Sequence, residues 1–179
     1  MFHIHIGVHK TGSTTLQRFF RLNAGVLAEA GVLYPDIGIL QSGHHEIAHA
    51  ARRGEFKTGV VAELSAFAKA NPSATALLST EAFDMLRRRP VKRLVAALKP
   101  HEAKVFVYVR DFTRLVPSKY SQLTKAGENL ADFDAFFERV VRHEMAKATQ
   151  PIERWASIVG WENVRIRALD PGSLAGGER

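Results

Sequence analysis

A glycine turn near the beginning of the chain contains residue types that can bind a phosphate or another anion. The stretch "KTGSTT" follows "FHIHIGV", whose alternation of apolar and polar residues predicts a strand, and it precedes a helical pattern. A strand, a glycine turn and a helix N-terminus form an anion site from backbone N–H groups and the helix dipole. Thr11, Ser13 and Thr14 add hydroxyl groups, Gly12 permits the turn, and Lys10 adds a positive charge. The competing interpretation is that Gly12 only allows a tight connection between strand and helix.

The position of Lys10 distinguishes this turn from the phosphate loop of nucleoside triphosphatases. That loop has its lysine directly after the last glycine, followed by the hydroxyl group that holds magnesium. Here Gly12 is followed by Ser13, and no apolar strand ends in an unambiguous magnesium-binding aspartate. We therefore expect the turn to bind an anion from a different reagent.

A second candidate anion contact lies in the stretch "VYVRDFTRLVPSKYSQ". Arg110 stands at the end of a predicted strand, and Ser118 follows it eight residues later. A guanidinium that leaves an apolar strand needs an anion, because an unpaired buried charge is costly. Taken alone, Arg110 is equally compatible with an ion pair to Asp111 or another carboxylate, and Ser118 with a helix cap.

Together these stretches resemble the sulfotransferases that use 3'-phosphoadenosine 5'-phosphosulfate (PAPS). "HIGVHKTGSTTLQ", "LLSTEAF" and "YVRDFTRLVPSKYSQ" look most like the bacterial carbohydrate-type branch. The resemblance implies that residues 10–14 grip the 5'-phosphosulfate, with Lys10 at the oxygen that bridges phosphate and sulfate. It also implies that Arg110 and Ser118 grip the 3'-phosphate. The reaction implied is metal-free transfer of a sulfuryl group to a hydroxyl or amine of an acceptor, which we expect to be a carbohydrate or another small hydroxyl compound.

Three residues are candidates for contact with that acceptor, whose proton a general base must take. Glu81 leaves the apolar run "TALLST" at the sheet edge where the glycine turn also emerges, and we expect it to be the base. Its alternative role is an acidic residue at the start of the following helix, stabilised by the dipole. His44 and His45 are expected at the acceptor and are the competing candidates for proton abstraction.

The stretch "HEIAH" at 45–49 matches the H-E-x-x-H pattern of zinc proteases. A zinc hydrolase would need a third ligand downstream, and His101 and His143 have no recognisable context for one. We therefore expect no metal site and a partly exposed helical position for His49.

Apolar runs that alternate with helical patterns predict a three-layer α/β/α fold with a central parallel sheet, like that of P-loop nucleotide-binding proteins. The runs at 73–81 and 103–111 are expected to be strands buried on both faces. In such sheets ligands bind at the carboxyl ends of the strands. Further strands are expected in 2–8, 31–35 and 163–169, and helices in 13–30, 44–70 (two), 90–100, 117–126, 132–146 and 150–159. The aromatic residues expected in the core are Trp155, Trp161, Phe133, Phe136 and Phe137.

The composition indicates one globular domain over the 179 residues, with 46% hydrophobic and 24% charged residues. The net charge of +7 favours anionic partners, while the basic run at 87–93 is either a solvated helix face or a contact for an anionic glycan. There is no cysteine, so disulfides and thiolate metal sites are excluded. No apolar run is long enough for a membrane span, and a chain that starts at residue 1 is expected in the cytoplasm. The ending "ALDPGSLAGGER" predicts a domain shortened at its C-terminus.

Two other functions compete with sulfuryl transfer. A P-loop nucleotide kinase or triphosphatase would bind ATP in a magnesium-dependent way. A non-catalytic basic module would bind a polysaccharide or nucleic acid with steep salt dependence and ignore the nucleotide. We expect a nucleotide donor and no nucleic acid partner.

Overall fold

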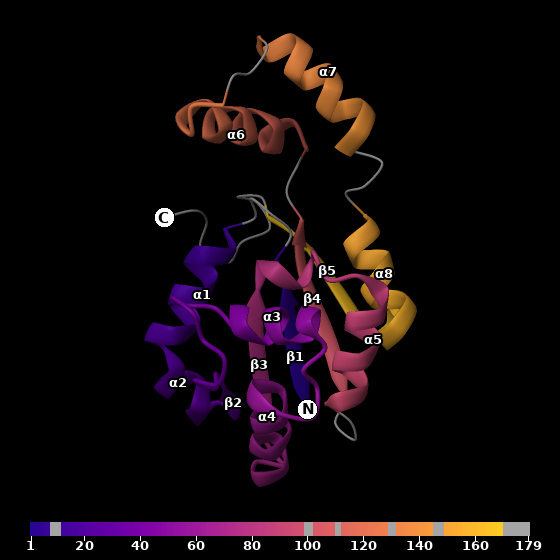
Figure 1. Cartoon of the computed structure of the whole chain (residues 1–179). Helices are drawn as coiled ribbons and strands as arrows, with labels where there is room; N and C mark the ends of the chain where they lie inside the picture. The colour runs from indigo at the N-terminus through magenta and orange to yellow at the C-terminus, as the bar shows by residue number, and fades with distance from the viewer. Residues whose placement is uncertain (8–11, 99–101, 110–111, 129–131, 145–148, 170–179) are drawn as a thin grey trace.

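A five-stranded sheet forms the centre of the computed structural model, which describes residues 1–7, 12–98, 102–109, 112–128, 132–144 and 149–169. All neighbouring strands pair in parallel, in the order β2-β3-β1-β4-β5 (Figure 1). The strands are Phe2–Ile6 (β1), Val32–Leu33 (β2), Thr75–Thr80 (β3), Ala103–Val109 (β4) and Val164–Ala168 (β5). The predicted parallel α/β fold is confirmed.

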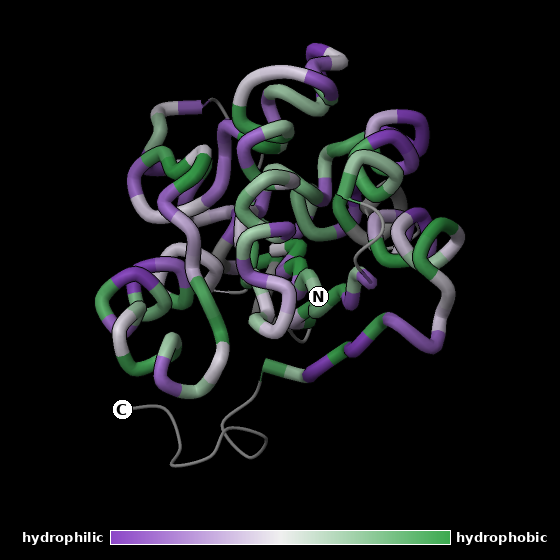
Figure 2. The backbone as a smooth tube through the Cα atoms, turned by 90° about the horizontal axis from the view of Figure 1, so that it is seen from below, coloured by the Kyte–Doolittle hydropathy of each residue, from purple (hydrophilic) through white to green (hydrophobic). Residues whose placement is uncertain are grey.

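Four helices pack on one face of this sheet and form the main core with it. Alternate residues of β1, namely Phe2, Ile4 and Ile6, are fully buried in this core, together with Leu64 and Trp155 from the helices. The helices are His45–Arg53 (α3), Gly59–Ala70 (α4), Arg88–Ala97 (α5) and Gln150–Val159 (α8). In Figure 2 hydrophobic and hydrophilic residues alternate along the helical parts of the tube.

The remaining helices lie elsewhere. Ser13–Leu22 (α1) packs against β3, and Ala24–Glu29 (α2) packs against β2, on the other face of the sheet. The odd-numbered side chains of β1 point toward this face. Phe112–Lys125 (α6) and Phe133–Glu144 (α7) pack on each other beyond the carboxyl ends of the strands (Figure 1). None of the helices in the described part of the chain is long and apolar enough to cross a membrane.

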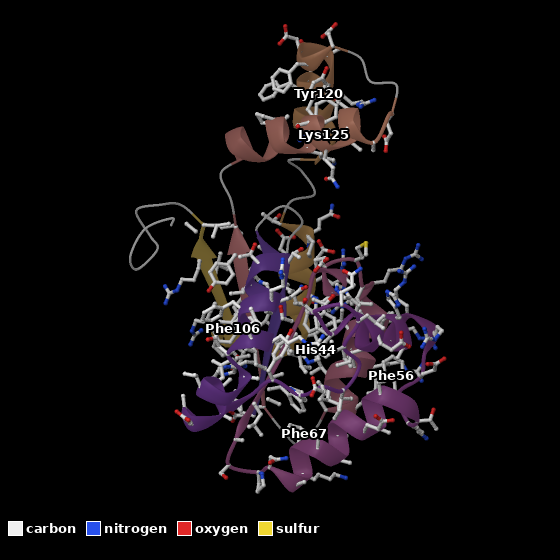
Figure 3. The ribbon with its side chains drawn as sticks, turned by 90° about the vertical axis from the view of Figure 1, so that its left-hand side faces the viewer. His44, Phe56, Phe67, Phe106, Tyr120 and Lys125 are labelled. Carbon is white, nitrogen blue, oxygen red and sulfur yellow. The ribbon has the colours of Figure 1, made fainter. Side chains whose placement is uncertain are left out.

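Two predictions about burial are wrong in part. β3 is buried on both faces as expected, but in β4 only Val105 and Val107 are buried, while Phe106 and Tyr108 are half-buried. The physical reason is that α1 and α2 cover β3 and β2 rather than β4 (Figure 3). Of the five aromatic residues expected in the core, Trp155 and Phe136 are buried. The other three, Trp161, Phe133 and Phe137, are exposed.

Candidate active site at the carboxyl ends of β1 and β3

The connection from β1 to α1 requires glycine at its first position. A Cβ on Gly7 would overlap Ser13 Oγ and would come within 3.1 Å of Glu81 Cα. The start of α1 and the residue after β3 therefore converge on the end of β1. Gly12, the residue before α1, has φ 72° and ψ 21°, the left-handed conformation that glycine adopts without strain. The predicted strand and helix are confirmed as elements, while residues 8–11 of the predicted turn lie outside the described residues.

The N-terminus of α1 begins after a glycine, which has no side chain to cap the first N–H groups of the helix. The first turn of α1 contains no acidic residue. Ser13 is only 7% exposed, yet its Oγ has no hydrogen-bond partner among the residues that the structure describes. A buried hydroxyl without a partner is destabilising, so this end of α1 is prepared for an acceptor such as an anion. Thr14 follows in the same turn and is exposed.

A polar layer separates α1 from the sheet. The buried residues of α1 are Ser13 and Gln17, four positions apart on one face of the helix. Beneath them on the sheet lies His5, whose Nδ1 is 2.7 Å from Ser79 Oγ of β3. Burial lowers the pKa of His5 to about 4, although the charge of Glu81 opposes this shift. The chain thus places polar groups where a purely structural α/β contact would be apolar.

Glu81 lies at the edge of this layer, directly after β3. It opens the short 3-10 helix Glu81–Phe83 and is half-buried. Gln17 Nε2 donates a hydrogen bond of 2.7 Å to Glu81 Oε2. The cap of the short helix is Thr80, whose Oγ1 accepts from the N–H of Ala82 at 3.1 Å. The capping role is therefore filled by a neighbour, and the Glu81 carboxylate turns toward α1.

His45 joins the same group of side chains from α3. Its Nδ1 is 2.7 Å from Thr80 Oγ1. Its Nε2 and the Oε1 of Gln17 both lie within 3.0 Å of the position that a Cβ on Gly43 would take. Two residues that the sequence left as competing bases, Glu81 and His45, are thus parts of one cluster.

His44 has a different role from the predicted one. Ser79 N–H donates to its Nδ1 at 3.1 Å, so Nε2 carries the proton and donates to Pro35 O at 2.9 Å. The ring is fully buried inside the molecule (Figure 3), and burial lowers its pKa to about 4. With both nitrogens bound to backbone, His44 has none left for an acceptor. We therefore remove it from the candidate site.

Four further candidates cannot be placed. Lys10, Thr11 and Arg110 lie outside the described residues. Ser118 lies within α6, whose backbone is described there, but its side chain is not. Their roles stay predictions.

The zinc-protease pattern does not form a metal site in the described part of the chain. No three histidine or acidic side chains there lie close enough together to hold a metal ion. His49 is partly exposed, 3.7 Å from Glu46 in the same helix, as predicted for an ordinary helical histidine.

The basic run lies on the opposite face of the sheet from α1. Exposed side chains of α5 line a groove of about 530 Å³ against α8; they are Arg88, Arg89 and Lys92. Apolar residues, among them Val95 and Ile158, also line this groove. The run is an exposed helix face beside a groove, and contact with an anionic glycan there stays a prediction.

Sequence reasoning missed Gln17 and Gly43. Gln17 stands four residues after Ser13 in a predicted helix, so its spacing was available as a signal, but a helical glutamine is usually exposed. Gly43 had no signal, because the space around it is limited by the side chain of Gln17, from a helix far away in the sequence, together with that of His45.

Comparison with known proteins supports the fold class. No family model matches the sequence, and no curated protein matches it. Among solved structures, the chain is similar to the crystal structure of a sulfotransferase from Alicyclobacillus acidocaldarius. The match has a TM-score of 0.51 and 15% sequence identity, and it covers 93% of this chain and 72% of that one. The chain therefore has a sulfotransferase-like α/β fold.

Proposed function

We propose that this protein transfers a sulfuryl group from PAPS to a hydroxyl group or amine of an acceptor, with a carbohydrate as the expected acceptor. The observation that carries the proposal is the convergence of Ser13 and Glu81 on Gly7. It brings the N-terminus of α1, where the Ser13 hydroxyl has no partner among the described residues, close to the backbone of the acidic residue Glu81. An anionic donor and a proton acceptor are the two requirements of the reaction. The sulfotransferase-like fold supports the same assignment.

On the donor side, the described residues fit a phosphosulfate group. The first-turn N–H groups of α1 and the Ser13 hydroxyl would donate to its oxygens, and Gly12 allows the backbone to approach closely. Lys10 is proposed to stabilise the charge that grows on the bridging oxygen as the bond to sulfur breaks. Arg110 and Ser118 are proposed to bind the 3'-phosphate.

On the acceptor side, Glu81 is the proposed general base. The acceptor oxygen attacks sulfur and loses its proton to the Glu81 carboxylate, while the bond between sulfur and the bridging oxygen breaks. Adenosine 3',5'-bisphosphate leaves with the electron pair of that bond. His45 is the competing base, since its Nδ1 lies beside Thr80 in the same cluster. The residues invoked need no metal for these steps.

Calorimetry with three nucleotides tests the proposal against its rivals. We expect adenosine 3',5'-bisphosphate to bind more tightly than AMP, and binding to be independent of magnesium. Preferential binding of magnesium–ATP would replace the proposal with a nucleotide kinase or triphosphatase. Binding of an acidic polymer with steep salt dependence, and of none of the nucleotides, would replace it with a non-catalytic basic module.

A further inference from the structure

Gln17 is a buried amide in the middle of α1, a position that an apolar residue normally occupies. Its side chain is 2% exposed. Burial of an amide is costly unless its polar atoms have partners, so the cost must be offset by the contacts it makes. One of those contacts is the 2.7 Å hydrogen bond from Nε2 to Glu81 Oε2. An ionised carboxylate only accepts hydrogen bonds, which fixes the amide nitrogen on the Glu81 side.

The amide oxygen consequently points to the other side, toward the loop before α3. Oε1 lies 2.7 Å, and His45 Nε2 3.0 Å, from the position of a Cβ on Gly43. Any side chain at Gly43 would therefore collide with both groups. A glycine here lets the amide oxygen and the imidazole approach the same point.

His45 contacts the residue just before Glu81. Thr80 Oγ1 accepts from Ala82 N–H at 3.1 Å and lies 2.7 Å from His45 Nδ1. A hydroxyl has one proton and two acceptor lone pairs, so Thr80 can pair with either tautomer of the imidazole.

We propose that Gln17 is a positioning residue, whose hydrogen bond from Nε2 holds the Glu81 carboxylate in place and in its ionised form. This inference rests on the proposed function, in which Glu81 is the base. A hydrogen bond to the charged form favours that form, and an amide, unlike a carboxyl, cannot take up the acceptor's proton itself. Within the described part of the chain, His5 from β1 interacts electrostatically with Glu81, and His45 from α3 contacts the preceding residue, Thr80.

The experiment follows the protonation of Glu81 directly and in parallel with turnover. Glutamate Cδ is labelled with carbon-13, its Glu81 signal is assigned by its loss in Glu81→Gln, and it is titrated by NMR in the parent chain and in Gln17→Leu. We expect the midpoint of the Glu81 titration to rise by about one pH unit in Gln17→Leu, as for the loss of a hydrogen bond to a charged group. The acid limb of the pH profile of kcat should rise with it, and kcat should fall roughly tenfold or more. Gln122→Leu, at an exposed position of α6, is the matched control and should change neither.

A second variant keeps the test decisive if Gln17→Leu does not fold. Gln17→Glu has nearly the same volume, but it places a second carboxyl beside Glu81, so the midpoint should rise further still. An unchanged midpoint in both variants would overturn the positioning role, and so would a fall in kcat without any shift of the acid limb. Absence of sulfuryl transfer in the parent chain would refute the proposed function instead, while the NMR midpoint would still report on the pairing of Gln17 with Glu81.

Discussion

Replacement of Ser13 by alanine should stabilise the free protein and weaken its binding of nucleotide, two effects of opposite sign. The stability effect follows from the buried Oγ, which has no partner among the described residues. An unsatisfied buried polar group costs about 1–3 kcal/mol, so Ser13→Ala should gain about 1 kcal/mol in the free energy of unfolding. For a chain of this length, such a gain raises Tm by about 2–4 °C.

The binding effect follows from the ligand that the hydroxyl would serve. A hydrogen bond to a charged group contributes about 1.5–3 kcal/mol, so the affinity for adenosine 3',5'-bisphosphate should fall by roughly 10- to 100-fold. Thermal unfolding without ligand and calorimetry with ligand measure the two effects on the same samples. Thr15→Ala, exposed in the first turn of α1, is the matched control and should alter neither quantity by much. Lower stability together with unchanged affinity would refute the assignment and make Ser13 an ordinary structural residue.

Four other perturbations test the rest of the site. Lys10→Ala should lower turnover by roughly 100-fold or more, the scale for loss of a positioned charge donor, and should weaken binding of the desulfated nucleotide less; equal turnover would remove Lys10 from the mechanism. Arg110→Ala should abolish the preference for adenosine 3',5'-bisphosphate over AMP, which we expect to be about ten- to more than a hundred-fold in the parent chain; a preference that survives would show that other groups read the 3'-phosphate. Glu81→Gln should remove most sulfuryl transfer and leave nucleotide affinity nearly unchanged. A structural role of Glu81 predicts instead a lower Tm with preserved turnover. If turnover survives in Glu81→Gln and is lost in His45→Ala, the base is His45. His5 and His44 have folded pKa values near 4 because of burial, against an ordinary value near 6.5, so only the unfolded state takes up protons between these values. The free energy of unfolding should therefore be highest above about pH 6.5 and fall progressively toward pH 4, by up to about 3 kcal/mol per histidine. Denaturant titrations at several pH values measure it. A free energy of unfolding that does not fall over this range would contradict the neutral buried state of both rings.

Local patterns in the sequence predicted most elements of the fold, but not all of their bounds. The helix expected over 13–30 is divided into α1 and α2, and the helix expected over 117–126 begins at Phe112. The alternation in 2–6 and the apolar run at 75–80 each depend on neighbours along the chain, and both formed strands as predicted. Exposure depends on what covers an element, which no local pattern contains. Phe106 is half-buried because α1 and α2 pack over β3 and β2. Phe133 and Phe137 are exposed because α7 packs on α6 beyond the sheet.

The candidate site likewise contains residues that the sequence predicted and residues whose roles it could not predict. Glu81 was found because strand ends meet at one edge of a parallel sheet, which is a property of the fold class. The difference between His44 and His45 was not accessible in this way, since the two are adjacent and of the same type. α3 begins at His45, and its starting point directs one ring to the backbone of Pro35 and Ser79 and the other to Thr80. That starting point depends on the course of the loop before it, which the sequence pattern does not specify.

Helix α1 itself argues for a function rather than a purely structural purpose. A helix that only covers a sheet gains most by burying its apolar residues, at roughly 25 cal/mol for each Å² removed from water. In α1, Phe19 is 53% exposed and the buried positions are given to Ser13 and Gln17. The fully buried positions of α1 are thus given to a hydroxyl and to an amide that binds Glu81, while the apolar Leu16 and Phe20 are only half-buried. Buried polar groups that lower the stability are expected where they bind a ligand or take part in a reaction. The variants of Ser13 test this for ligand binding, and the variants of Gln17 test it for the reaction.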